Sequence, residues 1–362
     1  MEAARHDPEA QPRRVWILRG PKSGDFVQMR ALADALGWGY ESKCLVFRRT
    51  ELVQHLWPRP TRAGLDLDAS SALAPPWPDL VLTAGRRNEL VARWIRKASP
   101  GTTRIVHIGR PWSRIETFDL VISTPQYPLD AAPAVLINDL PLHDITADAL
   151  AIAGGEWSGV LQGARPRLAL LVGGDSGPFV FSSALADRLA ARVNGLVRRS
   201  GARLWLSTSA RTPRAFAERL VAALDRPEHS WSWSRASGSA NPYRGYLALA
   251  DGFVVTSESV SMTAEALATG KPVWLFDVSS RSRLPWWLHA ESYRWKPLTH
   301  RLAQAFAPRR LRRDVGNIHA RLIDAERVMW LDDGAVFPAS WHQVPVAPEL
   351  ERSVAAVRRL FG

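Results

Sequence analysis

The sequence predicts an α/β protein built from two doubly wound domains that face each other across a cleft. A chain of 362 residues is too long for one typical domain and suits two, each with its own core. Short apolar segments alternate with segments of helical periodicity, first in one series and then in a second. The short segments are apolar throughout, which is typical of parallel strands covered on both faces.

The first domain is expected over 14–150, after a flexible tail at 1–13. An apolar run, Arg14 to Gly20, is followed by the loop PKSGD and a helical pattern that stops at Gly37. Further strands are predicted at 79–85, 103–109, 118–124 and 134–139.

The second domain is expected over 168–340, after a linker at 151–167 that is rich in Gly, Pro and Arg. Its predicted strands are 168–174, 203–209, 252–256 and 272–276, and its predicted helices are 182–201, 213–224 and 243–250. The segment 341–362 is predicted to be a C-terminal helix that returns to one of the two domains.

The composition is that of a globular protein, with 46% hydrophobic and 23% charged residues. No apolar run approaches the roughly 20 residues of a membrane-spanning helix. The N-terminus lacks the apolar core of an export signal, and Cys44 is the only cysteine, which excludes an internal disulfide. We therefore expect a reducing, cytoplasmic location.

The formal net charge of +12 favours anionic partners, or else reflects an arginine-rich host composition. The arginines are spread along the chain without a recognisable nucleic-acid motif, so we expect no nucleic-acid partner. The segment 281–296 mixes aromatic and cationic residues, as interfacial membrane segments do. We predict peripheral contact with the inner face of an acidic membrane, or with a lipid-linked acceptor, through Arg283, Trp286, Trp287 and Trp295; burial at a domain interface is the alternative.

Four loops follow strands and should meet at the carboxyl edges of the two sheets, where ligands bind in this architecture. They are Gly20–Asp25, Gly173–Phe179, Ser207–Pro213 and Thr256–Met262. Their glycines, hydroxyl groups and following helix N-termini are suited to phosphate, although none matches a P-loop or a G-x-G-x-x-G motif. The alternative is that they serve only as turns and helix caps.

The last of these loops leads into a helix on which Ser261 and Glu265, four residues apart, share a face. A carboxylate in the second turn of that helix can accept hydrogen bonds from the two hydroxyls of a ribose. We interpret Glu258 differently, as an acidic residue that stabilises the helix N-terminus electrostatically.

The stretches GGDSG, TSARTP and NPYRGYLALADGFVVTSESVSMTAEALATGKPV occur in an order that resembles the elongated-mitochondria family of plant mitochondrial fission, and its bacterial members in particular. The segment WILRGPKSGDFVQMRALADALG resembles the family's N-terminal part. That family in turn resembles glycosyltransferases of the two-Rossmann GT-B type. The resemblance implies a nucleotide diphosphate sugar as donor substrate, no further cofactor, and Glu265 on the ribose. The predicted binding residues are Lys22, Ser23, Gly24, Gly173, Gly174, Asp175, Ser176, Ser209, Arg211, Thr212, Ser257, Ser259, Ser261 and Glu265.

A transferase of this type stabilises its leaving diphosphate with helix N-termini and cations, for which we predict Arg211 and Lys22. No acidic pair has metal-ligand spacing, so we expect no metal. The base that activates the acceptor hydroxyl is predicted to be Asp25, or secondly His107, with an N-cap and a structural histidine as the alternatives. A non-catalytic GT-B scaffold that recruits partners at a membrane is the alternative function.

Overall fold

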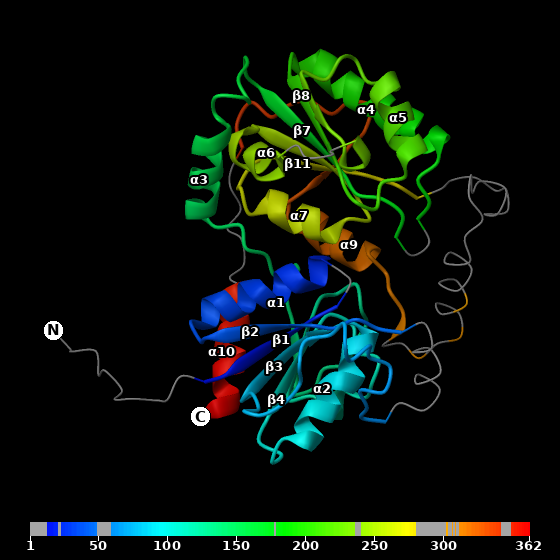
Figure 1. Ribbon diagram of the computed structural model, residues 1–362. Helices are drawn as coiled ribbons and strands as arrows, with labels where there is room; N and C mark the ends of the chain where they lie inside the picture. The colour runs from blue at the N-terminus through cyan, green and yellow to red at the C-terminus, as the bar shows by residue number, and fades with distance from the viewer. Residues whose placement is uncertain are drawn as a thin grey trace. The chain divides into compact units, whose positions relative to one another are not determined.

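The computed structural model describes residues 13–20, 23–48, 59–176, 179–235, 240–279, 302, 306, 308, 311–341 and 349–362. The chain divides between Asp144 and Ile145 into two compact units (Figure 1), and the residues from 349 onward belong to the first unit. Within the described ranges, no helix is long and apolar enough to cross a membrane.

The first unit is built on a parallel sheet with the strand order β2-β1-β3-β4-β5-β6. The strands are β1 Val15–Arg19, β2 Tyr40–Cys44, β3 Leu80–Ala84, β4 Arg104–Ile108, β5 Leu120–Ser123 and β6 Val135–Ile137. Its helical segments are α1 Ser23–Leu36, α2 Arg86–Ala98, η2 Ile115–Thr117, α10 Glu349–Arg358 and η6 Arg359–Phe361.

Alternate residues of these strands pack on opposite faces of the sheet, because side chains alternate along a strand. Ile17 and Leu82 face α1 and α10, whereas Trp16 and Val81 face α2. This double coverage explains why the strands are apolar throughout. The C-terminal helix α10 packs beside α1 in the same unit, which decides between the two placements that the sequence left open.

The second unit is built on another parallel sheet, with the strand order β12-β11-β10-β7-β8-β9. Its strands are β7 Arg167–Val172, β8 Arg203–Thr208, β9 His229–Trp231, β10 Gly252–Thr256, β11 Val273–Phe276 and β12 Met329–Trp330. Its helical segments are α3 Ala147–Trp157, α4 Ser183–Ser200, α5 Arg214–Ala223, η3 Trp233–Arg235, α6 Tyr243–Leu249, α7 Val260–Leu267 and α9 Gly316–Asp324.

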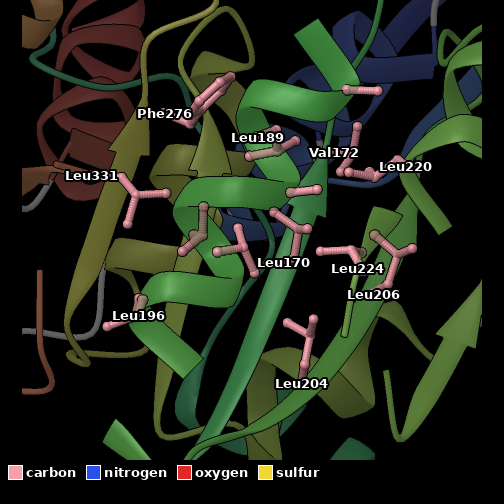
Figure 2. Packing of buried hydrophobic residues seen from close by; sticks show 14 of the residues in the cluster. Leu170, Val172, Leu189, Leu196, Leu204, Leu206, Leu220, Leu224, Phe276 and Leu331 are labelled. Atoms are coloured by element: carbon pink, nitrogen blue, oxygen red, sulfur yellow. The ribbon is translucent and has the colours of Figure 1, made fainter. Parts of the chain in front are cut away.

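Helices α4 and α5 cover one face of this second sheet. Figure 2 shows Leu170 of β7 and Leu206 of β8 among leucines of α4 and α5, such as Leu189 and Leu220. Helix α4 begins after the N-cap Ser182 and ends at Gly201, whose φ of 63° is the left-handed conformation that glycine adopts without strain. These caps confirm the helix boundaries that the sequence predicts.

The range 151–167, predicted as a linker, includes most of helix α3. This helix packs on α6 of the second unit, and Ala248 and Leu249 of α6 lie against Gly154. The weak periodicity of ADALAIAGGEW hid the helix, because small residues provide close packing without a strong apolar stripe.

Candidate functional site

The second sheet reverses its strand order between β7 and β10, since β8 and β9 extend from one side of β7 and β10 to β12 from the other. In open α/β sheets, ligands bind beyond the carboxyl ends of the strands at such a reversal. Three of the predicted loops follow β7, β8 and β10, which are neighbouring strands. The structure therefore brings together the predicted residues of these loops.

The loop after β7, Gly173–Ser176, is called the β7 loop. Its backbone is held by side chains at the end of β10 and in the loop after β8. The Gly173 N–H donates to the Thr256 hydroxyl over 2.9 Å. The Gly173 carbonyl accepts a hydrogen bond of 2.8 Å from the Ser209 hydroxyl and another from the Thr212 hydroxyl. Ser209 and Thr212, predicted to border a diphosphate, thus also fix the loop that would carry it.

The two glycines of the β7 loop are required by close packing. A Cβ at Gly173 would lie 1.8 Å from Oε1 of Glu258, and a Cβ at Gly174 would lie 2.2 Å from the carbonyl oxygen of Arg211. Both distances are far inside van der Waals contact, so any other residue would push the loops apart. The glycines let the backbone of one loop touch the neighbouring loops directly.

Glu258 lies at the centre of this arrangement, with only 1% of its surface exposed. Its Oε1 accepts a hydrogen bond of 2.8 Å from the Gly174 N–H and lies 3.7 Å from Nη2 of Arg211. Burial raises the pKa of Glu258 to about 7, although the Gly174 amide and Arg211 favour the ionised form. Glu258 therefore ties two loops together, a role beyond the helix N-terminus at which the sequence placed it.

Two guanidinium groups flank the β7 loop. Nη1 of Arg211 donates to the carbonyls of Gly174 and Asp175, at 3.2 and 3.4 Å, and 44% of the Arg211 side chain is exposed. Nη1 of Arg313 donates to the Ser176 hydroxyl at 3.0 Å. The loop is thus in contact with two cationic side chains, which favour an anion there.

The loop after β10 leads into α7 through the N-cap residue Ser259, which is buried. Ser257 is also buried, and its hydroxyl accepts a hydrogen bond from the Val278 N–H, so it supports the loop from within. Ser261 is half-buried in the first turn of α7.

Glu265 is half-buried in the second turn of α7, where its carboxylate accepts a hydrogen bond from the Tyr243 hydroxyl. Burial and the Glu265 charge raise the pKa of Tyr243 well above its ordinary value, so the phenol stays a donor at neutral pH. Tyr243 comes from α6, and it fixes the direction of the carboxylate that the sequence assigned to a ribose.

In the first unit, Asp25 lies in the first turn of α1, and a carboxylate oxygen lies 3.5 Å from the position of a Cβ at Gly85, just after β3. The strand order reverses between β1 and β3, so Asp25 lies at the switch point of its own sheet. His107 is fully buried, against Phe118 and 3.6 Å from Glu89. This burial favours the structural alternative for His107.

The remaining predicted residues are only partly described. Ser23 begins α1, and Gly24 follows it in an exposed position. Lys22 and the membrane-contact residues Arg283, Trp286, Trp287 and Trp295 lie outside the described residues. In the part of the chain that the structure describes, no group of three or more His, Cys, Asp or Glu side chains is placed to hold a metal ion.

Sequence reasoning missed three residues of this site: Glu258 as a link between loops, Arg313 and Tyr243. Glu258 had a signal, because an acidic residue two positions after an apolar strand faces the loops of neighbouring strands. Arg313 lies 137 residues from Ser176, its hydrogen-bond partner, and nothing in the sequence pairs them.

Comparison with known proteins finds a matching family model and similar proteins from a plant and a bacterium. A family model described as "Mitochondrial fission ELM1" matches residues 23–345. The mitochondrial fission protein ELM1 of Arabidopsis thaliana is 27% identical over 222 residues, which cover 55% of this chain and 51% of that protein. The match therefore spans about half the length of the plant relative. An uncharacterized protein of Rickettsia prowazekii is 23% identical over 301 residues, covering 72% of this chain and 82% of that protein.

Among solved structures, the chain resembles the UDP-GlcNAc 2-epimerase of Methanocaldococcus jannaschii, crystallised in complex with UDP-GlcNAc and UDP. The match has a TM-score of 0.51 with 10% sequence identity and covers 96% of this chain and 99% of that one. At this identity the likeness shows the fold alone, which is the two-sheet α/β fold of the GT-B type that the sequence predicts.

Proposed function

The chain belongs to the mitochondrial fission ELM1 family, and we propose that its second unit binds a nucleotide diphosphate sugar at the carboxyl edge of β7, β8 and β10. One observation carries the proposal. A tightly packed glycine loop lies at the topological switch point, where Arg211 and Arg313 donate hydrogen bonds to it. Glycine backbone and guanidinium groups at that place suit a diphosphate.

The nucleoside part is assigned to α7. A half-buried carboxylate that is already oriented by a phenol loses little conformational entropy when it accepts hydrogen bonds from a ribose. Glu265, held by Tyr243, meets this description, and the epimerase of the same fold was crystallised with UDP and UDP-GlcNAc. We therefore assign the ribose to Glu265 and the diphosphate to the loops of Gly173–Ser176 and Ser209–Thr212.

The proposed reaction is the transfer of the sugar to an acceptor without a metal ion. Arg211 and Lys22 would stabilise the negative charge that develops on the leaving diphosphate. Asp25 is the proposed base for the acceptor hydroxyl, because it lies at the switch point of the first sheet and is partly exposed. The aromatic and cationic composition of 281–296 supports an acceptor at an acidic membrane surface.

A non-catalytic scaffold at a membrane is the second candidate. The hydroxyls of Ser209 and Thr212 already bond to the backbone of their own chain, as they would in a protein that binds no nucleotide. The name of the plant relative, a mitochondrial fission protein, is compatible with such a role.

The experiment that separates the two candidates is thermal stabilisation by a panel of nucleoside diphosphates and nucleotide sugars, with and without divalent metal. A ligand that binds only the folded state raises the melting temperature, by mass action. We expect a shift with at least one nucleotide that does not need metal and that Glu265→Gln reduces, while the control Glu218→Gln, an exposed carboxylate of α5, leaves it unchanged. The absence of any shift, with all three proteins equally folded, would favour the scaffold.

A further inference from the structure

We propose that Glu258 is a positioning residue that couples anion binding at Arg211 to the uptake of one proton. This inference rests on the proposed function of the same site. It adds a regulatory property, because the affinity for the anion then depends on pH in a direction that the geometry determines.

Glu258 contacts both parts of the anion site at once, the backbone of the β7 loop and Arg211. Its Oε1 accepts a hydrogen bond of 2.8 Å from the Gly174 N–H and lies 3.7 Å from Nη2 of Arg211. While Glu258 is ionised, its charge offsets part of the charge of Arg211. An anion that approaches Arg211 must therefore compete with a carboxylate that is already present.

The Glu258 carboxylate is also buried. Glu258 is 1% exposed, so water screens it little from a second negative charge nearby. Two carboxylate or phosphate charges in one site raise the pKa of the group that can take a proton. Binding of an anion therefore favours the neutral form of Glu258, which leaves the full charge of Arg211 to the ligand.

Protonation of Glu258 at Oε2 leaves its hydrogen bond from the Gly174 amide intact. The Gly174 amide is bonded to Oε1, whereas the buried Oε2 has no hydrogen-bond partner among the described residues. A proton from solvent can bind Oε2 while Oε1 still accepts the hydrogen bond from the Gly174 amide. The pKa of Glu258, raised by burial to about 7, means that this exchange takes place near neutral pH.

Other charged or titratable side chains near the site include Asp175, Arg313 and His319. Asp175 and Arg313 lie on the β7 loop side, where Asp175 accepts from the Phe181 N–H and Arg313 donates to Ser176. His319 of α9 bonds to the carbonyl of Ser257, and burial lowers its pKa below the ordinary value. His319 is thus neutral over the upper part of the test range, and Glu258 remains as the proton acceptor.

The test measures binding of UDP-GlcNAc by calorimetry between pH 6 and 8.5, in two buffers of different ionisation enthalpy. A nucleotide sugar keeps a constant charge over this range, so a change in affinity reports on the protein. We expect affinity to fall with rising pH, about tenfold for each pKa unit that Glu258 gains on binding, with proton uptake near neutral pH. In Glu258→Gln both effects should vanish, and in the control Glu218→Gln both should persist.

Sulfate, which also keeps a constant charge, is the second probe and separates this inference from the proposed function. One outcome is that UDP-GlcNAc fails to bind while sulfate stabilises the protein with a pH dependence that Glu258→Gln removes. That result would support the coupling of anion binding to proton uptake and contradict the assignment of a nucleotide to the site. If UDP-GlcNAc binds with the same pH profile in parent and Glu258→Gln, the coupling is overturned and the nucleotide assignment stands. If neither anion binds, both are wrong.

Discussion

Replacing Glu258 by Gln should stabilise the ligand-free protein above neutral pH and have almost no effect at pH 4. The pKa of Glu258 is raised from 4.5 to about 7 in the folded state. The folded protein therefore holds this proton more tightly than the unfolded chain does. The contribution of Glu258 to stability is full below pH 4.5, falls as the pH rises to 7 and is then constant at its lowest value.

The magnitude follows from the same pKa values. A pKa difference of about 2.5 units, at about 1.4 kcal/mol for each unit, corresponds to about 3 to 4 kcal/mol between a pH below 4.5 and a pH well above 7. Gln is neutral at every pH, and its amide oxygen can still accept the Gly174 N–H. The Gln variant should therefore match the parent at pH 4 and exceed it by up to about 3 kcal/mol at pH 8.

The assay is urea denaturation of parent and variant at a series of pH values. The free energy of unfolding is taken from the unfolding transition of the second unit. A difference of this size should also move the melting temperature by about 6 to 12 °C at pH 8 for a domain of this length. Glu218→Gln, in an exposed pair with Arg214, should leave the pH profile as in the parent. Stability curves of parent and Glu258→Gln that run parallel from pH 4 to pH 8 would show that folding does not raise the pKa of Glu258.

Three further predictions concern the supports of the same unit. Gly174→Ala should cost about 1 to 3 kcal/mol, because its Cβ would lie 2.2 Å from the Arg211 carbonyl oxygen; an unchanged urea midpoint would contradict this. Ser182→Ala removes the hydroxyl that accepts the Leu185 N–H at the start of α4 and should cost about 1 kcal/mol, measured in the same way, whereas Ser182→Asp should restore most of it. Tyr243→Phe should leave the fold intact and weaken nucleotide binding several-fold in calorimetry, since Glu265 loses the phenol that orients it; equal affinities would assign Tyr243 to packing alone.

Much of the fold could be predicted from the sequence because its strands are apolar on both faces and its longer helices carry caps. Ser182 and Gly201 bracket α4 as expected. Strands with polar residues were missed: Tyr40–Cys44 is exposed at all but one position and forms the edge of its sheet. At a sheet edge a strand is held by backbone hydrogen bonds to one neighbour and needs few apolar side chains. Its amino-acid composition therefore gives little indication that it is a strand.

The candidate site could be predicted as a set of loops but not as a network of contacts. Parallel strands bring their carboxyl ends together, so the loops after β7, β8 and β10 had to meet. Which atoms touch depends on packing. The contact of Glu258 with Gly174 joins residues 84 positions apart, and that of Arg313 with Ser176 joins residues 137 positions apart. The sequence placed Glu258 at a helix N-terminus because local reasoning considers only the nearest turn.

Amide hydrogen exchange, with and without the nucleotide that gives the largest thermal shift, shows directly whether that nucleotide binds at the carboxyl edge of the second sheet. Bound ligand slows exchange of the amides that it covers or rigidifies. We expect protection in the loops Gly173–Ser176 and Ser209–Thr212 and in the first turn of α7, the helix Val260–Leu267. Binding that protects only amides elsewhere in the chain would contradict this expectation.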